Sequence, residues 1–257
     1  MKIAVLGAAG RMGRTIAALA AADPEFEICA LCERPDFPDM GREAVPGGPV
    51  YTADWPDCAD CAIDFTFHAA VPAQIARAAE RGTSYVLGTT GLSPEERAAV
   101  EEAARRIPVV ASANMSPGVN LMLAMVEKAA AALGDAYDAE IAEMHHRMKK
   151  DAPSGTAAML LEAVARGRGV DPRAAAVYGR QGIVGERPRG EIGVHALRGG
   201  SVVGDHSVIF AGDVERIEFV HRAQSRDAFA AGALRAALWT RRREPGLYSM
   251  RDVLGLA

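Results

Sequence analysis

The sequence predicts an α/β fold in two domains, one built on a parallel sheet and the other an α+β domain on a mixed or antiparallel sheet. Short apolar strands alternate with helical stretches through the first half of the chain, as they do in parallel sheets. After about residue 116, several strand patterns follow one another without helices between them, which favours a mixed or antiparallel sheet. The length of 257 residues leaves room for both domains.

The individual elements are placed by their apolar patterns and their turn residues. Ser93 before Pro94 and two glutamates is typical of a helix start, because serine caps the first N–H groups and proline fits the first turn. Strands are expected at 2–6, 28–32, 61–66, 85–88, 108–112, 138–144, 192–197, 207–211 and 216–220, and helices at 14–22, 68–81, from 93, and at 121–133, 156–166 and 229–240.

A glycine-rich turn, Gly7-Ala8-Ala9-Gly10-Arg11-Met12-Gly13, lies between the first strand and the first helix. Glycines at this spacing allow a tight turn and let the backbone approach a pyrophosphate, whose charge a helix N-terminus favours. Glu33 follows the second strand, twenty residues after Gly13, where a carboxylate can accept the hydroxyls of a ribose. The turn and the carboxylate therefore predict a Rossmann-type dinucleotide-binding domain.

The choice between NADH and NADPH depends on the next residue, Arg34. A guanidinium at this position can pair with the 2′-phosphate of NADPH, while Glu33 suits the free ribose of NADH. The pair predicts that both cofactors are accepted, and a solvated surface arginine is the alternative. Two polar loops, Gly88-Thr89-Thr90 and Ala113-Asn114-Met115, follow later strands at the sheet edge where ligands of such folds bind.

The segment 144–156 holds the densest group of candidate catalytic side chains. Adjacent His145 and His146 can exchange protons near neutral pH, and Lys149 can hold an anion or donate a proton. Ser154, Gly155 and Thr156 begin a predicted helix, whose first N–H groups make a seat for a carboxylate or phosphate. A solvated basic turn is the alternative interpretation.

Composition argues against several other classes of protein. The net charge of −4 and the pI near 5.9 leave no basic face for nucleic acid. No apolar run approaches the roughly 20 residues that span a bilayer, so no membrane association is expected. Met1 and Lys2 lead directly into the first strand, so we expect no signal peptide and a cytoplasmic enzyme.

The four cysteines form two CxxC units, Cys29-x-x-Cys32 and Cys58-x-x-Cys61, which raises the alternative of a zinc site. Cys29 and Cys32 fall on a predicted strand, where residues three apart point to opposite faces. Two ligands on opposite faces cannot grip one ion. We therefore expect buried, non-ligating cysteines and no metal site.

The motifs together resemble the 4-hydroxy-tetrahydrodipicolinate (dihydrodipicolinate) reductase family, essentially end to end. The segment with the two histidines is highly specific to that family, whereas the glycine turn alone is not. The matching stretches are GAAGRMG at 7–13, GTTG at 88–91, SANMSPGVN at 112–120, EMHHRMKKDAPSGTA at 143–157, YGRQGIVGERP at 178–188, RGGSVVGDHSVIFAGDVERIEFVHRAQSR at 198–226 and MRDVLGL at 250–256.

The resemblance implies a specific role for each candidate residue. Hydride from NADH or NADPH would reduce a small cyclic dicarboxylate of the diaminopimelate route to lysine, with His145 as proton donor and Lys149 as a catalytic and substrate-binding group. The substrate carboxylates would be held by His146, Ser154, Gly155 and Thr156. Cofactor contacts would come from Gly7 through Gly13, from Glu33 and Arg34, from Gly88 to Thr90 and from Ala113 to Met115.

The resemblance also implies the domain division and the assembly. Residues 226–257 are expected to return to the cofactor domain formed by 1–116, and 117–225 would form a substrate-binding and oligomerisation domain. The family is typically homotetrameric through the sheet of this central domain. A homotetramer is therefore expected here.

Two departures from the family pattern affect the expected contacts. Met148 stands where some members have a third histidine, and Phe67-His68 stands where many have a polar or basic residue near the cofactor. His68 is expected to begin a helix rather than to act in catalysis. The alternatives to the reductase are an amino-acid dehydrogenase, which lacks the histidine motif, and a dinucleotide sensor, which needs no proton donor.

Overall fold

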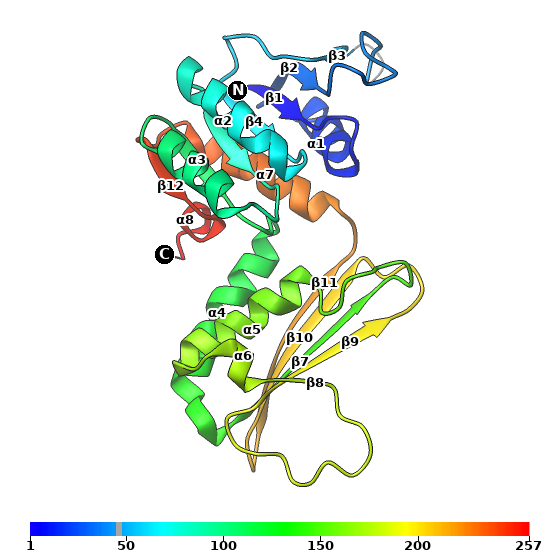
Figure 1. Ribbon diagram of the computed structural model, residues 1–257, viewed down its shortest axis with the longest axis vertical. Helices are drawn as coiled ribbons and strands as arrows, with labels where there is room; N and C mark the ends of the chain where they lie inside the picture. Colours follow the sequence, from blue (N-terminus) through cyan, green and yellow to red (C-terminus); the bar gives the residue numbers. More distant parts are fainter. Residues whose placement is uncertain (45–47, 257) are drawn as a thin grey trace. The chain divides into compact units, whose positions relative to one another are not determined.

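The computed structural model describes residues 1–44 and 48–256. The chain divides into two compact units: Met1–Pro117 together with Arg226–Ala257 form unit 1, and Gly118–Ser225 forms unit 2. The boundaries expected after residues 116 and 225 lie within one residue of this division. Each unit has its own sheet and its own hydrophobic core (Figure 1).

The sheet of unit 1 is parallel throughout, with the strand order β12-β6-β5-β4-β1-β2-β3. The order reverses between β1 and β4, and ligands of such sheets bind at the carboxyl ends of the strands beside the reversal. The strands are β1 Lys2–Leu6, β2 Glu27–Cys32, β3 Tyr51–Thr52, β4 Cys61–Asp64, β5 Ser84–Leu87, β6 Pro108–Ala111 and β12 Gly246–Tyr248. The helices are α1 Arg11–Ala21, η1 His68–Ala70, α2 Val71–Arg81, α3 Pro94–Ala104, α7 Asp227–Thr240 and α8 Met250–Leu254.

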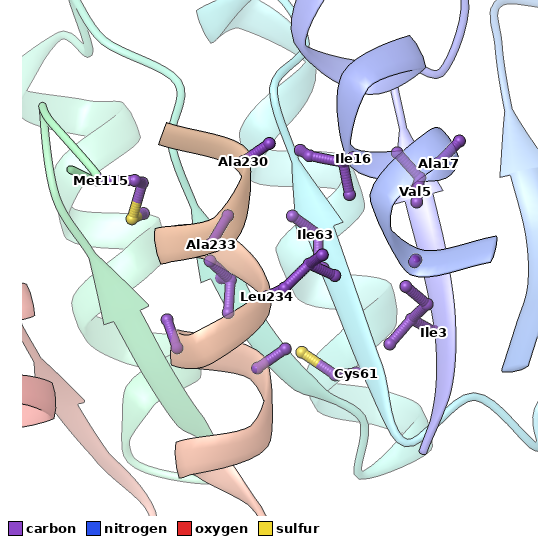
Figure 2. Close-up of a cluster of buried hydrophobic side chains, with 14 of the residues drawn as sticks. Ile3, Val5, Ile16, Ala17, Cys61, Ile63, Met115, Ala230, Ala233 and Leu234 are labelled. Carbon is purple, nitrogen blue, oxygen red and sulfur yellow. The ribbon is translucent and has the colours of Figure 1, made fainter. Parts of the chain in front are cut away.

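Helices cover both faces of this sheet, and the alternation of buried residues along the strands explains why. On β1, Ile3 and Val5 belong to the core shared with α1 and α7, whereas Ala4 and Leu6 belong to the core shared with α2 and α3. Figure 2 shows side chains of α7 packing toward Ile63 of β4. Because α7 comes from the last part of the chain, the C-terminal segment is needed to close this core.

The sheet of unit 2 is mixed, with the strand order β11-β10-β7-β9-β8. β10 pairs antiparallel with both β7 and β11, while β9 pairs parallel with β7 and β8. Residues of α4 and α5 pack on one face of the sheet and form its core. The elements are α4 Pro117–Leu133, η2 Gly134–Ala136, β7 Asp138–His145, α5 Gly155–Arg168, α6 Pro172–Ala175, β8 Ala176–Tyr178, β9 Ile192–Arg198, β10 Gly204–Ala211 and β11 Arg216–Ala223.

The predicted fold class is confirmed, and each predicted strand and helix is present with shifted ends. Helix α1 begins at Arg11 rather than at residue 14, so the last three residues of the glycine motif form its first turn. The prediction missed β3, β8, β12, α6 and α8, which are two to five residues long and therefore show little periodicity. Within the described ranges, no helix combines the length and the apolar character needed to cross a membrane.

The prediction for the cysteines was wrong in one respect. A register shift on β2, between the partners of Ile3 and Ala4, inserts an extra residue at Cys29, so Cys29 and Cys32 both pack against the same core. Burial raises the pKa of Cys29 to about 11 and that of Cys32 to about 12, so both thiols stay protonated at neutral pH. The described residues contain no group of three or more His, Cys, Asp or Glu side chains arranged to hold a metal.

Candidate active site

The glycine turn of unit 1 is held by main-chain hydrogen bonds. The N–H groups of Gly7 and Ala8 both donate to the carbonyl of Cys32, at 3.0 and 3.1 Å, and Gly10 donates to Gly7 at 3.0 Å. Gly10 is the N-cap residue of α1 and has no side chain with which to cap the helix. The first N–H groups of α1 therefore lie at the end of β1 as a seat for an anion.

Gly13 shows why this turn fits a dinucleotide. A Cβ at Gly13 would lie 2.2 Å from the carbonyl oxygen of Gly7 and 2.5 Å from the Cα of Ala8. Both neighbours are backbone atoms, which cannot move aside cheaply. Only glycine therefore lets α1 pack this closely on the turn, as a helix that supports a pyrophosphate must.

Glu33 and Arg34 lie at the carboxyl end of β2, and the structure gives them different surroundings. The N–H of Ala9 donates to Glu33 Oε1 at 2.8 Å, which fixes the carboxylate beside the turn. The Arg34 guanidinium is 69% exposed and pairs with Asp36 at 3.3 Å. The carboxylate is thus oriented by the fold, while the guanidinium takes part in a surface ion pair.

A cavity of about 430 Å³ lies at this strand end, and its lining includes Gly7, Glu33, Arg34 and Phe67. Its place beside the turn and beside Glu33 fits the ribose end of a dinucleotide. Phe67, a departure from the family pattern, is 70% exposed and is one of the residues that line this cavity. An aromatic residue therefore stands here in place of a polar or basic one.

His68 begins the short helix η1, as expected, but it also has a partner that the sequence did not reveal. Its Nδ1 lies 2.8 Å from Oε1 of Glu96, the residue that closes the capping box of α3. The hydrogen bond to His68 lowers the pKa of Glu96 below its usual value. The contact joins two helix starts, which is a structural role.

The two polar loops after β5 and β6 lie at the same sheet edge as the glycine turn, because all these strands are parallel. Thr89 donates to the carbonyl of Thr66 at 3.1 Å, and Asn114 accepts from the N–H of Ser116 at 2.8 Å. The Met115 side chain is only 2% exposed and lies in the core. A cofactor contact from Met115 would therefore have to come from its main chain.

In unit 2, strand β7 ends at His145 and helix α5 begins at Gly155, so the candidate residues lie on one strand end, one loop and one helix start. Ser154 caps α5: its hydroxyl accepts from the N–H of Ala157 at 3.2 Å. Ser154 is 2% exposed, whereas Gly155 beside it is exposed. The helix start thus presents main chain to solvent, and the serine hydroxyl is used to hold it.

A buried carboxylate that the sequence analysis missed, Glu143, lies at the centre of this region. His145 Nδ1 lies 2.6 Å from Glu143 Oε2, and the N–H of Ser154 donates to Glu143 Oε1 at 3.0 Å. Arg198 of β9 donates to both carboxylate oxygens, at 2.9 and 3.0 Å. Burial raises the pKa of Glu143, but the hydrogen bonds from Arg198, His145 and Ser154 outweigh burial and hold it below its usual value.

A second residue that the sequence did not predict, His206 of β10, packs beside His145. Its ring centroid lies 5.2 Å from that of His145, and its Nε2 lies 3.2 Å from the Ser154 hydroxyl. Burial, reinforced by the neighbouring charge of His145, lowers the pKa of His206 to about 4. His206 is therefore neutral at physiological pH and packs against the charged network without adding to it.

In the loop between His145 and Ser154, Lys149 forms an ion pair with Asp151. Lys149 Nζ lies 2.9 Å from Asp151 Oδ2, and the lysine side chain is 19% exposed. The hydrogen bond from Lys149 is the main cause that lowers the pKa of Asp151. His146 is fixed through its main-chain N–H, which donates to Val202 at 2.8 Å. Met148 is 77% exposed.

The signals for the missed residues differ in strength. Glu143 and His145 are two residues apart on a predicted strand, so the alternation of a strand already places them on one face. Arg198 and His206 reach the site only through the pairing of β7 with β9 and β10. That pairing depends on register between distant segments, which a single sequence does not reveal.

Unit 1 contains a glycine turn with an oriented carboxylate, and unit 2 contains a histidine hydrogen-bonded to a buried carboxylate, four residues before a lysine. A fold of this kind with these two features defines an oxidoreductase that uses a nicotinamide dinucleotide.

Comparison with known proteins identifies the family. Residues 1–115 match the profile of the dihydrodipicolinate reductase N-terminus, and residues 118–254 match that of its C-terminus. The 4-hydroxy-tetrahydrodipicolinate reductase of Anaeromyxobacter dehalogenans is 48% identical over 99% of this chain and 98% of its own length. The one from Afipia carboxidovorans is 51% identical over 100% of this chain and 97% of its own length. The chain belongs to the dihydrodipicolinate reductase family, as its motifs predicted.

Solved structures agree on the fold. The dihydrodipicolinate reductase of Paenisporosarcina sp. TG-14 superposes with a TM-score of 0.80 at 22% identity, covering 98% of both chains. The aspartate dehydrogenase of Thermotoga maritima reaches a TM-score of 0.51 at 12% identity, covering 95% of this chain and 98% of its own. The wider fold is thus shared with amino-acid dehydrogenases, while the sequence relatives are reductases.

Proposed function

We propose that this protein reduces 4-hydroxy-tetrahydrodipicolinate to tetrahydrodipicolinate in the diaminopimelate route to L-lysine. The single observation that supports the reaction most directly is the 2.6 Å contact between His145 and Glu143 in a chain about half identical to reductases of that name. A bound nicotinamide dinucleotide would supply the hydride. The reaction also consumes a proton and releases water, so the chain must provide a proton donor.

His145 is the proposed proton donor. A carboxylate can only accept hydrogen bonds, so the contact with Glu143 places a hydrogen on Nδ1 and leaves Nε2 as the reacting atom. Hydride delivery builds negative charge on the substrate ring, and proton transfer from Nε2 relieves it. General acid catalysis of this kind contributes about 10²–10⁴-fold to a rate.

Lys149 and the start of α5 are the proposed seat for the substrate carboxylates, together with His146 and Thr156. The dihydrodipicolinate reductase of Paenisporosarcina binds dipicolinate, a small dicarboxylate, which supports a substrate of that class. Lys149 already holds the carboxylate of Asp151 at 2.9 Å, so its ammonium is placed to hold an anion. Gly155 is exposed at a helix start, where N–H groups favour negative charge.

Both NADH and NADPH are proposed as cofactors, bound by the glycine turn, by Glu33 and Arg34 and by the loops after β5 and β6. Glu33 is oriented by Ala9 and suits the ribose of NADH. The Arg34 guanidinium is exposed, and its surface ion pair with Asp36 costs little to break when it binds a 2′-phosphate.

A homotetramer assembled through the sheet of unit 2 is also proposed. The face of this sheet opposite α4 and α5 includes the apolar side chains Leu197 and Val220, which are 49% and 46% exposed. Apolar side chains on an uncovered sheet face are typical of an interface. A cytoplasmic location is supported by the cysteines at positions 29, 32, 58 and 61, which are unpaired thiols, as in reducing compartments.

The test is an assay coupled to the synthase that makes the unstable substrate, following loss of absorbance from NADH and, separately, NADPH. We expect oxidation of both by the wild type and a fall in kcat of about 10²–10⁴-fold in His145→Gln. Lys149→Ala should raise KM and lower kcat. His195→Gln is the matched control, because His195 also pairs with a glutamate of β7, Glu140 at 2.7 Å, outside the proposed site.

Retained activity in His145→Gln, with the wild-type rate confirmed, would exclude His145 as the donor. A wild type that binds the dinucleotide tightly but does not oxidise it in the coupled assay would contradict the reductase proposal and favour a sensor. Light scattering tests the assembly, since a monomer at micromolar concentration would contradict the tetramer.

A further inference from the structure

We infer that Glu143 is the positioning residue of this site: it fixes the orientation and tautomer of His145 and joins the proton donor to the carboxylate seat at the start of α5 and to the loop that holds Lys149. The inference rests on the proposed function, because it assumes that His145 donates the proton. Glu143 itself is fully buried and is not expected to touch the substrate.

The hydrogen bonds of Glu143 leave little freedom to the carboxylate. Oε2 accepts from His145 Nδ1 and from Arg198, and Oε1 accepts from the Ser154 N–H and from Arg198. Each oxygen therefore has one partner from the site and one from the guanidinium. A bidentate guanidinium fixes the plane of a carboxylate, so the direction in which it meets the imidazole is fixed as well.

This geometry determines which nitrogen of His145 reacts. With Nδ1 donating to Glu143, the neutral ring carries no hydrogen on Nε2, and the imidazolium carries one on each nitrogen. Nε2 can therefore donate a proton only from the imidazolium, the form that a neighbouring carboxylate stabilises. The space at Nε2 is tight: a Cβ added at Gly204 would lie 3.0 Å from it.

The same carboxylate reaches the parts of the site that would hold anions. The Ser154 N–H donates to Glu143, which fixes the cap residue of α5. The position of the helix start is therefore fixed relative to the imidazole of His145. Arg198 also donates to the main-chain carbonyl of Asp151 at 2.7 Å, and the Asp151 side chain pairs with Lys149. One buried carboxylate thus connects the donor, the helix start and the lysine loop.

The alternative is that Glu143 forms a purely structural ion pair. The two roles differ in their effect on the protonation of His145. If Glu143 only stabilised the fold, its loss would lower stability without changing the protonation of His145. If it positions the donor, its loss leaves the Arg198 charge uncompensated beside the ring and disfavours the imidazolium. The groups around the ring are Glu143 on β7, Arg198 on β9 and His206 on β10, with His221 of β11 beyond it. The nearest charges of the loop are the ion pair of Lys149 and Asp151, which acts on His206 and Arg198.

The test is Glu143→Gln, which keeps the shape and removes the charge. Its amide oxygen can still accept from Ser154 or Arg198, but an amide NH₂ facing Nδ1 forces that nitrogen to accept, and the hydrogen moves to Nε2. We expect kcat to fall about 10–100-fold, the loss seen when a residue that orients a metal-ligating histidine is replaced. The pH at which kcat declines should move down, because the charge that favours the imidazolium is lost.

A readout independent of activity is nitrogen-15 NMR of the imidazoles. The chain has six histidines, so the His145 signals can be assigned by their loss in His145→Gln. We expect the neutral ring of His145 to carry its hydrogen on Nδ1 in the wild type and on Nε2 in Glu143→Gln. Glu143→Asp, which keeps the charge on a shorter side chain, should retain the wild-type tautomer and recover part of kcat.

Glu140→Gln is the matched control. Glu140 lies on the same strand, is also ion-paired with arginines and also meets a histidine, His195 at 2.7 Å, but it does not contact His145. We expect this variant to lose stability while it keeps kcat, the pH profile and the His145 tautomer.

The outcomes separate the inference from the proposed function. An unchanged pH profile and tautomer in Glu143→Gln would overturn the positioning role, even if stability fell. If Glu143→Gln does not fold, Glu143→Asp decides: a wild-type tautomer with partial kcat supports the role, and an Nε2–H tautomer overturns it. A wild type without reductase activity would refute the proposed function, while the NMR result would still report on the Glu143–His145 geometry.

Discussion

The glycine turn of unit 1 and the histidine network of unit 2 are built in opposite ways. The turn is made of main-chain hydrogen bonds and of side chains that are missing, as at Gly13, where a Cβ would lie 2.2 Å from a carbonyl oxygen. The network is made of charged side chains around the buried carboxylate of Glu143. Substitutions should therefore harm the turn by adding atoms and the network by removing charge.

The first prediction, with the largest expected effect, concerns the turn. Gly13→Ala adds about 1 kcal/mol of helix propensity, but overpacking against backbone costs about 1–3 kcal/mol. We expect a less stable protein whose affinity for NADH falls at least about tenfold, because the helix start must shift from the turn. Calorimetric titration with NADH and urea unfolding measure the two effects.

Gly10→Ala is the graded comparison for this prediction. A Cβ there would meet one atom, the carbonyl oxygen of Gly7, at 3.1 Å, so a shift of a few tenths of an ångström relieves it. A loss of affinity in Gly10→Ala as large as in Gly13→Ala would show that helix packing on the turn is not the cause.

The contrast between the two regions also explains what the sequence could predict. The turn is local, so the position of Gly7 through Gly13 between a strand and a helix could be predicted from spacing, although the helix began three residues earlier than expected. His145 and Lys149 were proposed from their chemistry. Arg198 and His206 were not, because their place beside His145 depends on strand pairing across more than 50 residues.

The cysteines show the same limit at the level of a single strand. The alternation rule places Cys29 and Cys32 on opposite faces, but a register shift against β1 turns both toward one core. A bulge of this kind is a property of the pair of strands, not of either one. Sequence patterns therefore predicted the order of the elements better than the direction of particular side chains.

The second prediction applies the same kind of substitution, an added methyl group, to the network. In Gly204→Ala the Cβ would meet Nε2 of His145, the proposed proton donor, at 3.0 Å. We expect the fold to persist and kcat to fall about tenfold, because small misplacements of a reacting group cost one to two orders of magnitude. Steady-state kinetics and thermal unfolding measure kcat and stability.

Gly199→Ala is the control, because its Cβ would meet only the flexible end of Met144, at 2.8 Å. We expect kcat within about twofold of the wild type, since the flexible Met144 side chain can adopt another rotamer at low cost. Equal losses of kcat in the two variants would contradict the explanation that a Cβ at Gly204 displaces His145.

The third prediction concerns the contribution of a charged side chain of unit 1 to the affinity for the cofactor. Glu33→Gln keeps the acceptor for the Ala9 N–H but removes the charge that would bind the ribose hydroxyls. A hydrogen bond to a charged group contributes about 1.5–3 kcal/mol, so we expect the Kd for NADH to rise about tenfold or more. The Kd for NADPH should change less, because its 2′-phosphate is repelled by a carboxylate.

Titration calorimetry with both cofactors measures this shift, and Arg34→Met is the reciprocal control. Arg34→Met should weaken the binding of NADPH alone, because the guanidinium is exposed and its ion pair with Asp36 lies at the surface. If Glu33→Gln weakens both cofactors equally, the carboxylate acts by holding the turn and not by choosing the ribose.

The fourth prediction has the smallest expected effect and concerns a charged network in unit 2 that lies outside the proposed site. Burial alone would raise the pKa of Glu140, but hydrogen bonds from Arg180, His195 and Arg187 bring it from 4.5 to about 2. A lowered carboxyl pKa stabilises the fold above about pH 4.5, and this contribution is lost as the pH falls toward 2. Glu140→Gln should therefore lower the free energy of unfolding by about 1–2 kcal/mol at pH 7 and by less at pH 3. Urea unfolding at both values measures the difference, and a loss that does not shrink at pH 3 would show that packing, not charge, explains it.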